Sequence, residues 1–344
     1  MDARWIRLDG VTPPELYACC QALGDQSPTH VRPVVLWARC DRAHVSLGAS
    51  QDPALELDLA ACRAREVAVE RRPLGGGAVL VDPDQWCFVF VVPRLRGAGQ
   101  RGRFFDQCLA PATATLRSFG IPAERAGVGD VWVAGRKILG SGAATLQGAE
   151  VFGASFLLRF PRAAFAALIR VPNDGFRGWL RDELDAGMTD WATHAPLPDA
   201  GELEARFRGH VTKHLGWRLT PGALTAVERA ALPEARMELA EPHGAGGRRR
   251  VVDGIKIRHG VYLLERDFGT LGRVRLVLRD GLIVRLRVWS EGVAEEASGQ
   301  ELRGAWAPGR GAVAWGSLRG VGAVEPLAER IEEMAVRTLD QEHG

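Results

Sequence analysis

Short apolar runs alternate with segments of helical periodicity along the first 240 residues. Strand-like runs occupy residues 34–37, 44–48, 67–70, 78–81, 86–92, 131–133 and 152–160. Apolar residues with helical spacing occupy 14–23, 58–65, 104–119, 161–169 and 202–215. Strands interleaved with helices predict an α/β (α+β) catalytic domain in which a mixed β-sheet is flanked by helices.

Turn residues predict two hairpins in this region. Asp82-Pro83-Asp84-Gln85 separates run 78–81 from run 86–92, which is a typical turn between paired strands. Ala134-Gly135 follows the run 131–133 and predicts a second turn, across which Asp130 and Lys137 lie near each other.

The composition changes at residues 241–250, a polar, glycine-rich run that includes Arg248–Arg250 and predicts a linker. Beyond it, apolar residues alternate over 261–265, 273–278 and 282–289, with Asp280-Gly281 as a hairpin signal, and a helix is expected over 326–339. We therefore expect a catalytic domain at 1–240, a linker at 241–250 and a small α+β C-terminal domain at 251–344.

Composition limits the class of protein. The 344 residues are 46% hydrophobic and 25% charged, as in ordinary globular proteins, and the net charge of +2 lacks the basic excess of a nucleic-acid binder. No apolar run approaches the roughly 18 residues of a spanning helix, and the first residues show no signal-peptide core. A cytoplasmic protein without nucleic-acid or membrane partners is expected.

Cysteines and histidines do not indicate a metal or disulfide framework. The six cysteines all precede residue 109 and form no C-x-x-C pair, so buried free thiols are expected. His210 and His214 share a helix face, but without an H-E-x-x-H pattern we interpret them as ordinary helix residues.

Lysine is rare, and one lysine lies in a glycine-flanked run. Only Lys137, Lys213 and Lys256 are lysines among 44 lysines and arginines, and Lys137 lies within residues 134–143. A compact ammonium, which the fork of arginine cannot replace, stabilises the charge that develops when a carboxylate attacks an α-phosphorus. Asp130 is the candidate carboxylate for a Mg²⁺ ion on the same phosphates.

A second glycine-rich segment lies upstream. Arg71 and Arg72 precede Gly75–Gly77, where the backbone can approach a ligand closely and offer N–H donors. Alone, this segment is equally consistent with a tight turn flanked by solvated arginines. Together with the Lys137 segment it predicts one anionic ligand held between the two loops, although neither loop is a Walker motif.

These residues resemble those of a known family. The run Arg71-Arg72-x-x-Gly75-Gly76-Gly77-Ala78-Val79-x-x-Asp82, followed by Asp130 and by Gly135-Arg136-Lys137-x-x-Gly140-Ser141, resembles lipoate–protein ligase A of the biotin/lipoate ligase superfamily. Leu36-Trp37 and the segment 47–51 also match. The resemblance covers roughly residues 30–160, and the tail from Ile255 resembles the small accessory domain of the ligase.

The resemblance implies a two-step reaction. Lipoate and MgATP give lipoyl-adenylate, and a lysine of an acceptor protein then attacks it and releases AMP. It implies that Lys137 is catalytic and that Asp130 assists the phosphates, with Mg²⁺ as its metal. The implied substrate- and nucleotide-binding residues are Trp37, Arg72, Gly75, Gly76, Gly77, Ala78, Val79, Asp130, Gly140 and Ser141. The implied acceptors are an E2 lipoyl domain, a glycine-cleavage H protein, or a lipoate-binding protein of sulfur metabolism.

Some positions depart from the family pattern. Val81 replaces a histidine, Gly129 an asparagine and Leu74 a small polar residue, and Phe152-Gly153 begins a segment that usually carries His-Gly-Thr. Because these positions surround the expected pocket, the acyl substrate or its placement can differ from that of the typical enzyme.

Three alternatives stay open. An octanoyltransferase of the same superfamily would use a cysteine nucleophile, but residues 122–129 hold none and no cysteine follows Cys108, which favours the ligase. A biotin ligase would place its Gly-Arg loop before a strand, whereas the similar run 96–103 follows one. A non-catalytic lipoate-binding protein is the third.

Overall fold

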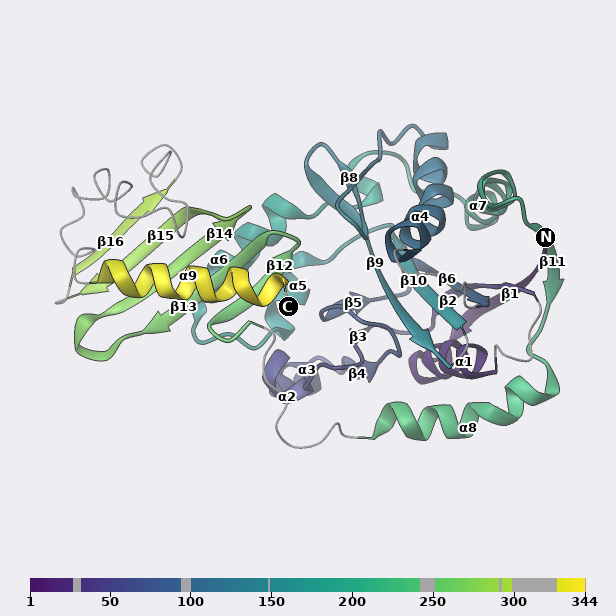
Figure 1. Cartoon of the computed structure of the whole chain (residues 1–344), viewed down its shortest axis with the longest axis horizontal. Helices are drawn as coiled ribbons and strands as arrows, with labels where there is room; N and C mark the ends of the chain where they lie inside the picture. The colour runs from purple at the N-terminus through teal and green to yellow at the C-terminus, as the bar shows by residue number, and fades with distance from the viewer. Residues whose placement is uncertain are drawn as a thin grey trace. The chain divides into compact units, whose positions relative to one another are not determined.

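The computed structural model describes residues 1–26, 32–93, 100–147, 149–241, 251–290, 293–298 and 327–343 (Figure 1). The chain forms two compact units: Met1–Leu168 with Asp185–Gly247, and Ile169–Leu184 with Arg248–Gly344. Nearly all of the expected linker, 242–250, and the first half of the run 96–103 lie outside the described residues. The domain boundaries at 240 and 251 stay predictions; segment 169–184 belongs to the second compact unit.

The first unit is built on an eight-stranded sheet. In sheet order its strands are β11 (Arg218–Gly222), β1 (Asp2–Val11), β2 (Val34–Cys40), β6 (Gln85–Pro93), β10 (Ala149–Leu157), β9 (Arg136–Leu146), β8 (Asp130–Val133) and β7 (Glu124–Ala126). Strand β1 pairs in parallel with β11 and β2, while the other neighbours are antiparallel. The predicted mixed sheet is confirmed.

Helices cover both faces of this sheet (Figure 1). Because side chains alternate along a strand, Val35 and Trp37 of β2 pack toward α4 (Gln100–Ser118) and α7 (Ala200–Leu215), and Leu36 packs toward α1 (Pro13–Asp25). The remaining helices of this unit are α2 (Pro53–Glu56), α3 (Leu59–Ala64), α5 (Arg162–Leu168) and α8 (Ala226–Ala240), which packs on α1. Within the described ranges, no helix is long and apolar enough to span a membrane.

Aromatic side chains fill the core beneath α7. The ring of Trp37 stacks on Trp86 with centroids 5.1 Å apart, on Phe207 at 5.2 Å and on Trp5 at 5.8 Å. Large flat rings bury much apolar area and favour such offset stacks. This cluster fixes β1, β2 and β6 against α7.

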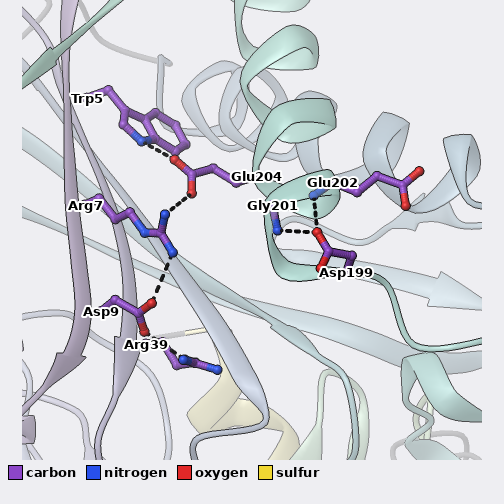
Figure 2. Close-up of polar contacts among 8 residues, drawn as sticks. All are labelled: Trp5, Arg7, Asp9, Arg39, Asp199, Gly201, Glu202 and Glu204. Atoms are coloured by element: carbon purple, nitrogen blue, oxygen red, sulfur yellow. Dashed lines mark hydrogen bonds and ion pairs between the residues drawn. The ribbon is translucent and has the colours of Figure 1, made fainter.

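A chain of polar contacts joins α7 to side chains of β1 (Figure 2). The indole N–H of Trp5 donates to Glu204 at 2.9 Å, and the second carboxylate oxygen of Glu204 pairs with Arg7 at 3.4 Å. Arg7 also contacts Asp9, which accepts a hydrogen bond from Arg39 on β2. The chain links the helix to two strands.

A small three-stranded sheet carries the glycine-rich segment. Its order is β4 (Ala68–Arg71), β3 (His44–Leu47) and β5 (Val79–Val81). The predicted hairpin between runs 78–81 and 86–92 is therefore wrong. Both edges of β6 are occupied by β2 and β10, so β5 pairs with β3 instead. As a result, residues 75–77 connect two strands that share β3 as their neighbour.

The second unit is an antiparallel sheet with a helix on each face. Its strands are β12 (Gly254–Arg258), β13 (Val261–Asp267), β14 (Arg273–Arg279), β15 (Leu282–Ser290) and β16 (Val293–Ser298). Asp280 and Gly281 have φ of 50° and 80°, which confirms the predicted hairpin. Helix α9 (Ala328–His343) packs on the apolar face through Ile331 and Met334.

Helix α6 (Asp174–Gly187) covers the opposite face of this sheet through aromatic and charged residues. The buried Arg275 pairs with Glu265 and donates to Asn173 at 2.7 Å, just before the helix. The guanidinium of Arg285 lies 3.7 Å from the ring centroid of Trp179. A helix from the middle of the chain thus completes the C-terminal layer.

Candidate active site

Lys137 and Asp130 meet across the β8–β9 hairpin. Ala134 and Gly135 have φ of 48° and 75°, the left-handed pair typical of a two-residue hairpin turn. The lysine Nζ lies 2.7 Å from Oδ1 of Asp130, and the two side chains are 20% and 13% exposed. The ion pair is thus partly screened from water but remains accessible.

A bulge in the hairpin puts these side chains on one face. Asp130 lies opposite Gly140 and Trp132 opposite Lys137, with an extra residue on β9 between them. Lys137 and Gly140 are three residues apart, so in a regular strand they would face opposite sides of the sheet. The extra residue of the bulge places both on the same side. A Cβ on Gly140 would lie 2.6 Å from both Cε and Nζ of Lys137. The glycine therefore leaves room for the lysine stem.

The main chain of Lys137 is held by a segment that sequence reasoning missed. Thr189 N–H donates to the Lys137 carbonyl at 2.9 Å, and Met188 forms a parallel bridge with Lys137. The Thr189 hydroxyl lies 2.8 Å from Nε2 of His194. Burial, with a contribution from nearby Arg136, lowers the pKa of His194. Residues 188–194 have no periodicity that would have marked them.

Ser141 supports the turn that precedes Asp130. Its hydroxyl donates to the Gly129 carbonyl at 2.6 Å. A Cβ on Gly129 would lie 3.1 Å from the Ser141 hydroxyl and 3.2 Å from the Phe105 ring. Position 129, where the family pattern has asparagine, therefore holds a glycine at a point where this turn comes close to β9 and α4.

Arg72 is folded back onto its own loop. The side chain is 9% exposed, and its guanidinium donates to the carbonyls of Ser46 at 2.7 Å, Gly75 at 3.0 Å and Gly77 at 2.7 Å. These bonds fix the curvature of the glycine-rich segment. In this conformation Arg72 shapes the loop, and its contact with a ligand stays a prediction.

The glycine-rich segment lies against the strand that carries Lys137. Gly75 N–H donates to the Ala143 carbonyl on β9 at 3.4 Å. Gly76 has φ of +104°, and its carbonyl would lie 2.1 Å from a Cβ on Gly48, so only glycine fits at 48. Gly76, Gly77 and Val79 are exposed and Ala78 is half-buried. The structure thus brings both predicted segments together.

Trp37 does not join this group. Its side chain is fully buried in the aromatic cluster on the opposite face of the sheet from Leu74, the residue next to the glycines. Sequence alternation alone did not reveal this, because nearly every residue of β2 is apolar and either face is compatible with burial.

A buried polar network beneath the glycine loop was also missed. The Tyr17 hydroxyl lies 2.7 Å from Nε2 of His44, and the Ser46 hydroxyl accepts from Arg72 at 3.3 Å. His44 is fully buried, and burial lowers its pKa to about 4, so it is neutral at pH 7. The residues come from α1, β3 and the end of β4, and no local signal connects them.

The metal expectation rests on Asp130 alone. Among the described residues, no three histidine, cysteine, aspartate or glutamate side chains gather as they would in a protein-held metal site. Mg²⁺ needs only one or two carboxylates when phosphates and water supply its other ligands. Asp130 fits that arrangement with a nucleotide.

All six cysteines are buried and free, as expected. Burial raises the pKa of each thiol, to about 12 for Cys19 and Cys40. A reactive cysteine needs an exposed, electropositive setting that favours the thiolate. None of these thiols has one.

Comparison with known proteins gives consistent matches. Residues 15–207 match the family described as lipoyl protein ligase A/B catalytic domain. The chain is similar to octanoyltransferase LipM of Kyrpidia tusciae, with 30% identity over 213 residues that cover 55% of this chain and 78% of that protein.

Two solved structures share the fold. A bi-partite lipoate protein ligase from Thermoplasma acidophilum, described with its E2 lipoyl domain, has a TM-score of 0.63 and 20% identity, covering 69% of this chain and 92% of that one. Lipoate-protein ligase A bound with ATP has a TM-score of 0.58 and 19% identity, covering 69% and 95%. At these identities the likeness concerns the fold.

Proposed function

The chain belongs to the lipoyl protein ligase A/B catalytic domain family, and on that premise we propose that it is an ATP-dependent lipoate–protein ligase. The family resemblance and the mixed α/β fold expected from the sequence are confirmed, so the chain is an enzyme of the lipoate ligase and transferase family. The observation that carries the ligase proposal is the Lys137–Asp130 pair beside the glycine-rich segment.

The first step joins lipoate to the nucleotide. A lipoate carboxylate oxygen attacks the α-phosphorus of ATP, and pyrophosphate leaves. In this proposal the Lys137 ammonium, which lies beside Asp130, stabilises the negative charge that grows on the phosphate oxygens. Exposed Gly76 and Gly77 leave the backbone open to the nucleotide. Asp130 would hold Mg²⁺, which supplies charge neutralisation to the phosphates.

The second step transfers the lipoyl group. An amine of an acceptor lysine attacks the carbonyl carbon of lipoyl-adenylate, an amide forms and AMP leaves. The acceptor is a lipoyl domain of an E2 subunit, a glycine-cleavage H protein, or a lipoate-binding protein of sulfur metabolism. The related archaeal ligase, described with its E2 lipoyl domain, supports the first of these.

An octanoyltransferase is the second candidate, because the curated relative carries that name. Such an enzyme needs a thiolate nucleophile. The buried thiols, with pKa values raised by burial, argue against it. An adenylate-forming ligase needs no protein nucleophile.

An acylation assay tests the proposal. Purified protein, lipoate, MgATP and each acceptor are combined, and the intact mass of the acceptor is measured with Lys137→Ala and the double variant Cys87→Ser/Cys108→Ser alongside. A lipoyl mass gain that needs ATP, disappears in Lys137→Ala and survives in the serine variant supports the ligase. A mass gain of the acceptor that requires an acyl-carrier thioester as donor, occurs without ATP and is lost in the serine variant would instead indicate a transferase.

A further inference from the structure

Four buried polar side chains lie together beneath the glycine-rich segment: Tyr17 of α1, His44 and Ser46 of β3, and Arg72, which directly follows β4. His44 and Ser46 are two residues apart on one strand, so their side chains leave the same face of β3. The Tyr17 ring meets the imidazole edge-on, with the centroids 5.6 Å apart. Because buried polar groups are costly unless they are hydrogen-bonded, the bonds among these four residues decide how they are arranged.

The histidine sets the direction of these hydrogen bonds. Nδ1 of His44 lies 3.5 Å from the Arg42 carbonyl, a long contact with a group that can only accept, so we assign the proton of the neutral ring to Nδ1. Burial lowers the pKa of His44 to about 4, which keeps the ring neutral at pH 7. Nε2 is then an acceptor, and the Tyr17 hydroxyl, 2.7 Å away, donates to it.

The remaining bonds run in the same direction. The Tyr17 hydroxyl gives its only proton to His44, so in its hydrogen bond with Ser46 it accepts. The Ser46 hydroxyl in turn accepts from Nη1 of Arg72 at 3.3 Å. Donation therefore runs without a break from the guanidinium through the two hydroxyls to the imidazole. Aligned hydrogen bonds in a low-dielectric interior polarise one another, so the loss of one link weakens the next.

The other end of this network is the backbone of the glycine-rich segment. Nη2 of Arg72 donates to the first and last carbonyls of residues 75–77, at 3.0 and 2.7 Å, and Gly76 between them has φ of +104°. Glycine backbones adopt many conformations, so this one depends on the guanidinium that holds it. The guanidinium is itself held by Ser46, through the carbonyl and the hydroxyl. The tyrosine and histidine thus act on an exposed loop from a buried position.

We propose that Tyr17 and His44 are positioning residues of the nucleotide site: through Ser46 and Arg72 they hold residues 75–77 in the conformation that binds ATP. The inference rests on the proposed function, since it takes ATP as the ligand of this loop. A loop that leaves its binding conformation binds more weakly, in proportion to the fraction of time for which that conformation is lost. Disruption of the network should therefore weaken ATP binding and leave the rate of the bound complex nearly unchanged.

Hydrogen exchange tests the hold on the loop independently of catalysis. The reporters are the amides of Arg72 and Gly75, which donate to the carbonyls of Leu47 and Ala143, in peptides that cover residues 72–80. Mass spectrometry compares the wild type with two variants that break the network at different links, Tyr17→Phe and Ser46→Ala. Both are expected to exchange about tenfold faster in these peptides, as for the loss of one buried hydrogen bond.

Tyr262→Phe is the matched control, because it removes a hydroxyl from the only other tyrosine of the chain, also buried but in the second compact unit. It should leave exchange in residues 72–80 unchanged. Wild-type exchange in both Tyr17→Phe and Ser46→Ala, or equal acceleration in Tyr262→Phe, would overturn the proposal.

The direction of donation is tested at the histidine. In protein labelled with ¹⁵N in histidine, NMR should show the His44 ring protonated at Nδ1 and bare at Nε2, the signals being identified by their loss in His44→Gln. The glutamine oxygen can take the place of Nε2 and accept from Tyr17, so His44→Gln should keep slow hydrogen exchange, whereas His44→Leu should match Tyr17→Phe. A ring protonated at Nε2, or equally fast exchange in both His44 variants, would overturn the proposal.

ATP binding separates this inference from the ligase proposal. The Kd for ATP and the kcat of ATP–pyrophosphate exchange with lipoate are measured on the same variants. Tyr17→Phe and Ser46→Ala should raise Kd about tenfold and change kcat by less than about twofold, whereas Lys137→Ala should lower kcat. An unchanged Kd in both network variants would overturn the positioning role. A wild type that neither binds ATP nor exchanges pyrophosphate would reject the ligase proposal, and the hydrogen-exchange result alone would then decide whether Tyr17 holds the loop.

Discussion

The Lys137 ammonium contacts the Asp130 carboxylate at 2.7 Å across a bulged hairpin, with the lysine stem lying over Gly140. The contact holds the ammonium in place without ligand. It also joins the ammonium that we propose binds the phosphate to the carboxylate that we propose holds the metal ion.

Replacement of Lys137 by arginine is expected to abolish most adenylation. The planar fork is wider than an ammonium and cannot occupy the same point beside Asp130. We expect a loss of about 10²-fold or more in kcat for ATP–pyrophosphate exchange, in the range found for removal of one charge-stabilising donor. Lys213→Arg, on helix α7 rather than on β9, is the control. A fully active Lys137→Arg would contradict the assigned role.

Gly140→Ala is expected to impair the reaction while the protein stays folded. The added Cβ would lie 2.6 Å from the end of the lysine side chain, which is flexible and can move aside. The ammonium would then leave its position, lowering kcat with little change in melting temperature. Gly209→Ala, where a Cβ meets nothing within 4 Å, provides the comparison. Equal activity in both variants would show that the fit over Gly140 is unimportant.

Arg72→Lys tests the loop-shaping role of the guanidinium. One ammonium cannot reach the carbonyls of Ser46, Gly75 and Gly77 together, so buried acceptors lose partners. We expect a loss of about 2–3 kcal/mol in the free energy of unfolding, measured by urea titration. The exposed Arg65→Lys should change it by less than about 0.5 kcal/mol, and similar values for both would refute the idea.

His44 predicts a stability loss in mild acid. Its pKa falls from 6.5 to about 4 on burial, so between these values the unfolded chain binds a proton that the folded chain does not. The His44 contribution to stability is therefore complete above pH 6.5 and is lost as the pH falls toward 4. Asp82, whose pKa burial raises to about 6, acts in the opposite direction over an overlapping range.

The difference between wild type and His44→Gln isolates this effect. Between pH 7 and pH 5 the wild type should lose about 2 kcal/mol more of its free energy of unfolding than the variant. Urea titrations at both pH values measure it. Parallel losses in the two proteins would mean that His44 is not buried as a neutral group.

Local turn chemistry was readable from the sequence. Ala134-Gly135 and Asp280-Gly281 both form the predicted hairpins because their positive φ values are a property of a few adjacent residues. The pairing of Asp130 with Lys137 follows from the first of these. The predicted hairpin at Asp82-Pro83 is wrong. Strand β6 pairs with β2 and β10, which come from other parts of the chain, so neither of its edges is free for β5.

Side-chain roles at the site were less readable. The sequence identified Arg72 and the glycines as candidates. It did not reveal that the Arg72 guanidinium donates to the carbonyls of Ser46 and of the loop, because that contact requires β3 to lie alongside. Thr189 contacts Lys137 from 52 residues further along the chain, and Tyr17 contacts His44 from another element. Such contacts have no periodic signature.

Helix α6 has a consequence for how the chain can be divided. It precedes the C-terminal strands by many residues, yet the helix supplies Trp179 to their sheet and the residue just before it, Asn173, accepts a hydrogen bond from Arg275. A single cut within 242–250 would therefore leave each fragment with part of one folded body. The two fragments should assemble into the native fold when they are produced together. A C-terminal fragment produced alone should aggregate, because the aromatic and arginine-rich face of its sheet is no longer covered by α6.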